Sequence, residues 1–371
     1  MLIPYCLNIH PGETLEDVRD AITSHALQVK ARLAPDQPYP LGLRLSAMAV
    51  EEFTHTDTLE LFRELLEGND LYVTGINGFP YGTFHGQAVK NAVYQPDWST
   101  KARVNYTMRL CSILAALLPE GTSGNVSTAP LSYKPESHPD VAQLYLENIS
   151  SIADFLKQLH QETGKRISLA IEPEPDCVIE SCGEVIQWFQ QFYTRHDAAR
   201  EYIGICLDTC HCAVEFENPL AVIQQLEAAE IRIERIQLSA AIATTITRES
   251  IIALQPFIDP VYLHQIKIRR VDGTLISLPD LTDATLSAAL LHTGAELRTH
   301  FHVPLFLAGG NLLQSTHNDL SHEFFAHVMQ RNYPLEIESY TFDILPPKIK
   351  PDNIIDSLVL EHAWVMARLP S

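Results

Sequence analysis

Three short strings in this chain place a carboxylate at the end of an apolar run. They are Leu-Ala-Ile-Glu-Pro-Glu-Pro at 169–175, Ile-Cys-Leu-Asp-Thr-Cys-His at 205–211 and Leu-Glu-Ile-Glu-Ser-Tyr at 335–340. A buried strand has little reason to end on an acid unless the acid does chemistry, holds a cation or is paired. We therefore expect Glu172, Asp208 and Glu338 to form one site, assembled from strands far apart in the sequence.

The alternation of side chains along a strand predicts where these acids point. Successive side chains lie on opposite faces, so Glu172 faces away from the apolar Ile171, and Asp208 and Glu338 follow the same pattern. Three crowded carboxylates repel one another unless some are protonated or a cation lies among them. Oxygen ligands favour Mg²⁺ or Mn²⁺, and nearby histidines admit Zn²⁺, Co²⁺ or Fe²⁺. Salt bridges to Arg or Lys at the strand ends are the structural alternative.

Three histidines are candidates for metal or substrate binding. His211 follows Asp208 by three residues at a strand-to-helix turn, where it can ligate a metal or bond a substrate hydroxyl. His300 and His302 lie on one face of an extended segment. Such a pair suits a metal chelate and equally suits a polar edge.

Three further residues are candidates for contacts to a substrate. The alternation of side chains along a strand places His10 and Arg44 inward on the first two strands, at the same end as the acids. His85 lies in the segment 78–86, whose Gly, Pro and aromatic content suits a shaped substrate loop. An ordinary packed loop is the alternative for that segment.

The chain contains seven cysteines and no visible secretion signal. An odd number in a chain of 371 residues favours reduced thiols in a cytoplasmic protein. Cys206, Cys210 and Cys212 surround Asp208, so a thiolate zinc site is an alternative there, although their spacing matches no zinc-ribbon pattern.

Strand-like and helix-like segments alternate about eight times along the chain. We expect strands at 2–10, 41–45, 71–76, 124–128, 168–172, 203–208, 233–238 and 335–338. The clearest helix follows 124–128, with Ser137 as its predicted N-cap and Gly164 at its end. Repeated βα units predict a parallel sheet, and eight of them favour a closed (β/α)₈ TIM barrel. An open doubly wound sheet usually carries a Gly-rich turn after its first strand, which 8–13 lacks.

The spare length lies between the seventh and eighth strands, at about 240–334. It holds a predicted hairpin around Asp272-Gly273 and a second extended piece at 297–306. The chain shows no long linker or low-complexity tract. We therefore expect one domain over 1–371 with an insertion in its C-terminal half.

Charge and hydropathy limit the classes of partner. Acidic residues outnumber Lys and Arg by 46 to 26, which gives a formal charge of −20. This charge repels phosphate backbones, so we expect a small-molecule substrate and no nucleic acid. No apolar run is long enough to cross a bilayer, and the N-terminus lacks the basic region of a signal peptide.

The motifs resemble those of the xylose isomerase-like TIM barrel superfamily, which includes sugar isomerases, sugar epimerases and the endonuclease IV class. The resemblance rests on Glu at the fifth strand end, Asp-x-x-His at the sixth and Glu at the eighth. It implies metal ligands at Glu172, Asp208 and Glu338. The fourth ligand of the superfamily is normally a His on the seventh strand, but Gln237, a weaker and neutral oxygen donor, stands in that position.

The resemblance also implies which of these residues transfer protons and what the metal does. In the sugar epimerases the two glutamates flank the substrate and move a proton, which would give these catalytic roles to Glu172 and Glu338. The metal acts as a Lewis acid on two substrate oxygens. His300 or His302 could supply the missing ligand from the insertion. Loss of that ligand leaves a non-catalytic binding or carrier protein as an alternative, and the acidic charge disfavours an endonuclease-type phosphodiesterase.

A second resemblance runs from end to end of the chain. It is similar to the EboE family, the TIM-barrel proteins of the ebo metabolite traffic gene cluster, in its strings at 8–13, 77–82, 130–134, 171–175, 207–211, 237–241 and 300–306. This resemblance implies a part in moving small secondary-metabolite precursors toward the cell envelope. Other proteins of the ebo cluster are the partners that it implies.

Overall fold

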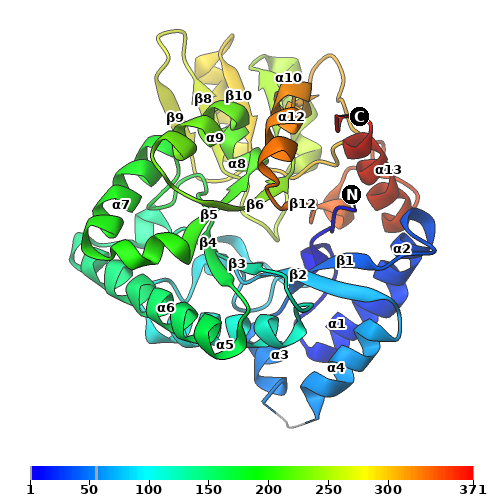
Figure 1. Ribbon diagram of the computed structural model, residues 1–371. Coiled ribbons are helices and arrows are strands. Elements are labelled where there is room, and N and C mark those ends of the chain that lie inside the picture. Colours follow the sequence, from blue (N-terminus) through cyan, green and yellow to red (C-terminus); the bar gives the residue numbers. More distant parts are fainter. Residues whose placement is uncertain (1, 55–56, 371) are drawn as a thin grey trace.

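The computed structural model describes residues 2–54 and 57–370, and its centre is a parallel β-barrel. Figure 1 shows the strands as a ring surrounded by helices. Hydrogen bonds join the strands in the order β1-β2-β3-β4-β5-β6-β12. Their bounds are β1 Tyr39–Arg44, β2 Leu71–Asn77, β3 Gly124–Thr128, β4 Ile167–Ile171, β5 Ile203–Asp208, β6 Ile233–Leu238 and β12 Leu335–Ile337.

The N-terminal segment closes the ring between β12 and β1. Tyr5 forms a parallel bridge with Ile337, and Cys6 forms one with Gly42. The strand predicted at 2–10 is therefore confined to these two bridges, because Leu7–Ile9 turns into a 3-10 helix. With this segment counted as the first strand, the (β/α)₈ TIM barrel expected from the sequence is confirmed.

Helices cover the outside of the ring (Figure 1). The helix predicted between Ser137 and Gly164 starts later than expected, because Pro139–Val141 forms a 3-10 turn and α6, which begins at Ala142, has no side-chain cap. Gly164 ends α6 in the left-handed conformation, with φ of 72°, a conformation that glycine adopts without steric cost. The helices are α1 Leu15–Ala21, α2 Leu27–Leu33, α3 Ala47–Glu52, α4 Thr58–Glu67, α5 Lys101–Leu117, α6 Ala142–Thr163, α7 Cys182–Arg195, α8 Thr209–Val214, α9 Pro219–Ala228, α12 His322–Arg331 and α13 Ile354–Met366.

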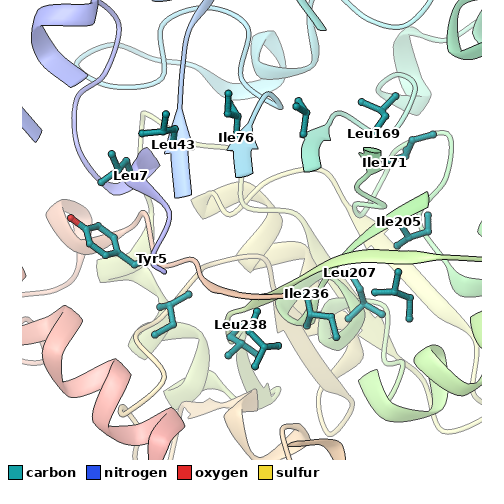
Figure 2. Close-up of a cluster of buried hydrophobic side chains, with 14 of the residues drawn as sticks. Tyr5, Leu7, Leu43, Ile76, Leu169, Ile171, Ile205, Leu207, Ile236 and Leu238 are labelled. Carbon is teal, nitrogen blue, oxygen red and sulfur yellow. The ribbon is translucent and has the colours of Figure 1, made fainter. Parts of the chain in front are cut away.

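The main hydrophobic core lies between the ring of strands and the helices. Figure 2 shows apolar side chains of successive strands around the outer side of the ring, among them Leu43, Ile76, Leu169, Ile205 and Leu238. These residues alternate with the side chains that point into the barrel, as the period of two requires. The same alternation turns the acids that end β4, β5 and β12 away from this core.

The insertion between β6 and β12 forms a second, antiparallel sheet in the order β11-β7-β10-β8-β9. The predicted hairpin is present as β8 and β9. Figure 1 shows this sheet beside the barrel. The elements are β7 Ile242–Thr245, α10 Arg248–Leu254, β8 Ile266–Arg269, β9 Leu275–Leu278, α11 Asp283–Ala289, β10 Glu296–Thr299 and β11 Gln314–Ser315. Within the described ranges, every helix is too short or too polar for a membrane span.

Candidate metal centre

The three acids predicted from the sequence meet at the carboxyl ends of the barrel strands. Glu172 follows β4 directly, Asp208 is the last residue of β5, and Glu338 follows β12 directly. One carboxylate oxygen of each lies within 4.8 Å of the others, and all three residues are at most 3% exposed. The C-terminal end of a barrel is where enzymes of this architecture hold their catalytic residues.

The electrostatics of the three acids differ from one residue to the next. Burial, followed by the charges of Glu338 and Asp208, raises the pKa of Glu172 well above its usual range. Burial, followed by the charges of Asp208 and Glu336, does the same to the pKa of Glu338. Burial also acts to raise the pKa of Asp208, but His211, His302 and hydrogen bonds outweigh it, so that the pKa is lowered. The cluster is therefore short of positive charge, which a divalent cation would supply.

Hydrogen bonds hold Glu338 and Asp208 in place. Asn8 Nδ2 donates to Glu338 Oε1 at 2.6 Å, and Asn77 Nδ2 donates to the same atom at 3.0 Å. Asn77 Oδ1 accepts the backbone N–H of Phe79, which fixes the orientation of the Asn77 amide. Ser239 Oγ lies 2.8 and 2.9 Å from the two oxygens of Asp208.

Glu172 is held less completely than its two neighbours. Its Oε2 atom is buried and has no hydrogen-bond partner among the described residues. A buried carboxylate oxygen without a partner is costly. This free oxygen and the oxygen-rich donor set fit a bound divalent cation at Glu172, Asp208 and Glu338.

Gln237 points into the barrel, as the alternation of side chains along β6 requires, but its hydrogen bond is to a cysteine and not to one of the three acids. Its Oε1 accepts a hydrogen bond from Cys206 Sγ at 3.0 Å, and its buried Nε2 has no partner among the described residues. The hydroxyl of Ser239, which follows β6, donates to Asp208. The sequence could have indicated Ser239, because it lies two residues beyond Gln237 and therefore on the same face of the strand.

The structure brings the three candidate histidines together beside the carboxylates. His300 Nε2 lies 3.2 Å from His211 Nε2 and 3.0 Å from His302 Nε2. His211 also lies 3.9 Å from oxygens of both Glu172 and Asp208. Burial, followed by the neighbouring histidines, lowers the pKa of His300 well below its usual value. Burial lowers the pKa of His302 to about 4, although Asp208 acts in the opposite direction.

The three predicted substrate contacts lie behind the wall of the site. His10 stacks on His25 with ring centroids 4.3 Å apart, and it accepts or donates a bond to Tyr5. Arg44 pairs with Glu13 at 3.1 Å. His10 and Arg44 are not lining residues of the cavity at this end of the barrel.

His85 occupies a supporting position of the same kind. Its Nε2 lies 2.7 Å from the carbonyl oxygen of Asn8, and its Nδ1 lies 3.1 Å from Tyr262 Oη. Both Asn8 and Tyr262 line the cavity, whereas His85 does not. The three residues are thus near the site without facing its interior.

A cavity opens in front of Glu172 and Glu338, and its free space, counted together with the adjoining open solvent, is about 510 Å³. Asp208 is not among its lining residues, so the two glutamates face the space while Asp208 stands behind them. The polar lining also includes Glu174, whose carboxylate accepts a hydrogen bond from Tyr94 at 2.7 Å. Aromatic residues form much of the remaining wall: Phe79, Phe84, Tyr94, Tyr262 and Tyr340.

Several of these lining residues were missed by sequence reasoning. Glu174 and Tyr340 each follow a predicted acid by two residues, so parity alone could have flagged them. Tyr262 comes from the insertion, and its approach depends on how the second sheet packs, which no local pattern shows.

All seven cysteines are free and buried. Cys210 groups with His300 and His302, but no candidate metal group among the described residues joins two of the cysteines around Asp208.

Comparisons with known proteins identify the fold. No protein-family model and no curated protein matches the chain. A xylose isomerase-like TIM barrel protein from Mycobacterium smegmatis, solved in complex with magnesium, aligns with a TM-score of 0.55 at 12% identity over 99% of this chain and 96% of that one. The probable 3-DHS dehydratase AsbF, involved in petrobactin synthesis in Bacillus anthracis, aligns with a TM-score of 0.52 at 13% identity over 99% of both chains.

An L-ribulose 3-epimerase structure aligns with a TM-score of 0.50 at 11% identity, over 100% of this chain and 95% of that one. Identities this low carry information about architecture and not about substrate. The chain has the fold of a xylose isomerase-like TIM barrel, with an insertion between the seventh and eighth barrel strands.

Proposed function

We propose that this protein is a metal-dependent enzyme of the sugar isomerase or epimerase type, acting on a small hydroxy-carbonyl compound. The observation that carries the proposal is the convergence of three buried carboxylates at the ends of β4, β5 and β12, one of which keeps an oxygen without a partner in the described part of the chain. The fold relatives include a probable dehydratase and an epimerase, so chemistry of this class has precedent on the fold.

The positions of the three acids suggest two roles, metal binding and proton transfer. Glu172, Asp208 and Glu338 would hold the cation, which supplies Lewis-acid polarisation of a substrate carbonyl when bound. Glu172 and Glu338 also face the cavity. One of them removes the proton from the carbon beside the carbonyl, and the other returns a proton from its own side of the substrate.

The surrounding residues orient the reacting groups. Asn8 and Asn77 fix Glu338 through two amide hydrogen bonds, so that its second oxygen is presented in a defined direction. His211 lies between Glu172 and Asp208 and also lines the cavity, where it can bond a substrate hydroxyl. The aromatic wall offers an apolar surface against which the carbon skeleton of a small substrate can pack.

The cavity supports a small organic substrate over a nucleic acid. Carboxylates and aromatic rings line it, and the chain carries a formal charge of −20. An endonuclease-type phosphodiesterase would need a basic groove for the phosphate backbone.

We also propose that the chain belongs to the EboE family and acts on a secondary-metabolite precursor, with other ebo proteins as partners. The seven strings that resemble this family support the proposal, and five of them contribute residues to the cavity: 77–82, 171–175, 207–211 and 300–306 through the lining, and 8–13 through Asn8. A cytoplasmic location suits this role.

A non-catalytic binding or carrier protein is the second candidate. It is favoured by Gln237, which stands where the superfamily normally has a His ligand and whose oxygen is engaged by Cys206. A weakened metal centre could retain ligand binding while losing turnover. The two candidates share the cavity and differ in whether a carbon–hydrogen bond breaks.

Deuterium exchange separates the two candidates directly. The protein is refilled with Mg²⁺, Mn²⁺, Zn²⁺, Co²⁺ or Fe²⁺, its metal content is measured, and it is incubated in D₂O with hydroxy-carbonyl compounds, beginning with L-ribulose. We expect deuterium to enter the carbon beside the carbonyl, as read by NMR, and to stop entering after chelation. Ligand binding that survives chelation, without exchange into any compound, would establish the carrier instead.

A further inference from the structure

Carbonyl oxygens fix the protonation of two histidines beside the carboxylates. His211 Nδ1 lies 2.8 Å from the carbonyl oxygen of Pro173, and His302 Nδ1 lies 3.1 Å from that of Glu338. A carbonyl oxygen accepts hydrogen bonds and cannot donate one. Each Nδ1 therefore carries the hydrogen, and each Nε2 of the neutral ring carries a lone pair.

The orientation of Gln265 fixes the third ring in the same way. Gln265 Nε2 donates to the carbonyl oxygen of Pro175 at 3.1 Å and lies 2.8 Å from Tyr94 Oη. Its Oε1 therefore faces His300 Nδ1, at 2.8 Å. His300 Nδ1 carries the hydrogen, and the lone pair of this ring is again on Nε2.

The Nε2 atom of His300 thus faces the Nε2 atoms of His211 and His302, with no hydrogen in either contact. His300 Nε2 lies 3.2 Å from His211 Nε2 and 3.0 Å from His302 Nε2. All three histidine residues are at most 5% exposed. Tyr340 Oη lies 3.5 Å from His300 Nε2 and can serve one lone pair at most. A single added proton would turn one of the two nitrogen–nitrogen contacts into a hydrogen bond. The other contact would still join two nitrogens with no hydrogen between them.

We propose that these three Nε2 atoms bind a second divalent cation of the zinc class, distinct from the ion of the carboxylate centre. Three nitrogens at about 2.0–2.1 Å from a tetrahedral zinc ion lie about 3.3 Å apart, close to the 3.2 and 3.0 Å that separate His300 Nε2 from the Nε2 atoms of His211 and His302. The outward Nδ1–H bonds to carbonyl and amide oxygens orient the ligands from behind, as in metal-bound histidines.

A fourth ligand is within reach on either side of the histidines. Donor atoms of Glu174, His211 and His300 lie within 4.8 Å of one another, and so do those of Asp208, His211 and His302. If Asp208 is the fourth ligand, it binds both ions and bridges them. If Glu174 is the fourth ligand, the two ions share no ligand. The nitrogen-rich site selects Zn²⁺ or Co²⁺, while the oxygen-rich site accepts Mg²⁺ or Mn²⁺. This inference does not depend on turnover, since a carrier could hold both ions.

Metal counting tests the proposal. The metal-free full-length protein is refilled with Zn²⁺ or Co²⁺, passed through a desalting column and analysed by mass spectrometry of the elements. We expect two ions per chain in the wild type and one in His300→Ala and His302→Ala. Glu338→Gln should also retain one, and His138→Ala, which removes an exposed histidine, should retain two.

Cobalt spectra assign the remaining ion in each variant. A four-coordinate, nitrogen-rich Co²⁺ site absorbs visible light more strongly than a six-coordinate oxygen site. The strong bands should persist in Glu338→Gln and disappear in His300→Ala. A wild type that binds one ion, or one ion lost alike in Glu338→Gln and His302→Ala, would overturn the second site and indicate a single shared centre. Neither outcome bears on deuterium exchange, so the proposed activity stands or falls separately.

Discussion

Glu172 and Glu338 occupy equivalent strand ends but have different surroundings. Two amides hold one oxygen of Glu338, whereas Oε2 of Glu172 is free of partners within the described part of the chain. A carboxylate with a fixed direction suits a proton transfer of defined geometry. A carboxylate with a free oxygen can adjust to a cation or a substrate. The asymmetry supports distinct roles for the two glutamates.

Replacing either glutamate with an isosteric amide tests their shared importance. In Glu172→Gln or Glu338→Gln we expect deuterium exchange to fall by about 10²- to 10⁴-fold, the usual contribution of a positioned acid or base. NMR of the incubated substrate measures the rate. Glu323→Gln, on the exposed face of α12, is the control and should exchange as the wild type does. Unchanged exchange in both site variants would remove these residues from the chemistry.

Ser239 supports Asp208 from behind the carboxylate centre. Its hydroxyl lies within 2.9 Å of both Asp208 oxygens, so Ser239→Ala deprives a buried carboxylate of a donor. Residues that orient a metal ligand typically contribute 10- to 100-fold in affinity. We expect Mn²⁺ titration by calorimetry to show a loss of about this size, while Ser112→Ala on the exposed face of α5 leaves the affinity unchanged. An affinity equal to that of the wild type would contradict this role.

At this scale the sequence indicates which residue types converge, but not their contacts. Parity identified Glu172, Asp208 and Glu338 because each ends an apolar strand. The superfamily resemblance pointed to Gln237, and nothing in the sequence shows that Ser239, two residues later, is the residue that donates to Asp208. Strand stagger around a closed barrel decides that question, and stagger is a property of all the strands together.

Below the carboxylates, a buried ion pair joins the barrel strands. Arg235 on β6 pairs with Glu336 on β12 at 2.7 Å, and both side chains are buried. A Cβ at Gly42 on β1 would collide with the Glu336 carboxylate, and one at Gly75 on β2 would collide with the Arg235 guanidinium. The two glycines therefore leave the space that the ion pair fills.

Removing one partner of this pair should destabilise the barrel strongly. Arg235→Met leaves Glu336 buried without a counter-charge, which typically costs about 3–5 kcal/mol. We expect urea unfolding to show a loss of this order. The double variant Arg235→Met/Glu336→Gln removes both charges and should recover part of the loss. If the double variant were less stable than Arg235→Met, the pair would not be the source of the effect.

The elements themselves were largely predictable, and their ends were not. Hydrophobic periodicity and turn residues located the βα units, because burial on one face of a helix or strand imprints its period on the sequence. The first strand was overestimated, since apolar character at Leu7 and Ile9 fits a buried 3-10 turn as well as a strand. The start of α6 was misplaced because Pro139 suits either kind of helix at its first turn.

At the scale of the whole molecule, the insertion completes the site. It carries His300 and His302 to within reach of His211 on α8, and it places Tyr262 in the cavity wall. Lys267 on β8 anchors the second sheet to the barrel through a buried pair with Glu215 at 3.1 Å. The sequence showed that an insertion exists but not that its residues reach the carboxyl end of the barrel, because such packing depends on contacts between distant segments.

Glu361 on α13 links the insertion to the end of β12. Its Oε2 accepts hydrogen bonds from Ser339 Oγ at 2.6 Å and from the backbone N–H of Leu305 at 3.1 Å. Burial raises the pKa of Glu361 to about 7, although both hydrogen bonds act to lower it. The C-terminal helix thus holds the segment that follows His302 and the residue that follows Glu338.

This buried carboxyl should make stability depend on pH in a defined direction. Because its pKa is higher in the folded chain than in the unfolded one, the folded state binds the extra proton, and the free energy of unfolding falls as pH rises from about 4.5 to 7. Glu361→Gln keeps the shape and cannot ionise. The unfolding free energy of Glu361→Gln minus that of the wild type should therefore increase across this range, by an amount on the order of 3 kcal/mol.

Urea unfolding at half-unit pH steps between 4.5 and 7.5 measures this difference. The metal-free protein is used for both chains, so that pH-dependent metal binding does not contribute. Glu67→Gln, at the exposed end of α4, should run parallel to the wild type because an exposed carboxyl gains no buried charge on folding. Parallel curves for Glu361→Gln as well would mean that Glu361 stays ionised in the folded protein. A difference that grows with pH would instead show that ionisation of the buried carboxyl costs the folded state stability.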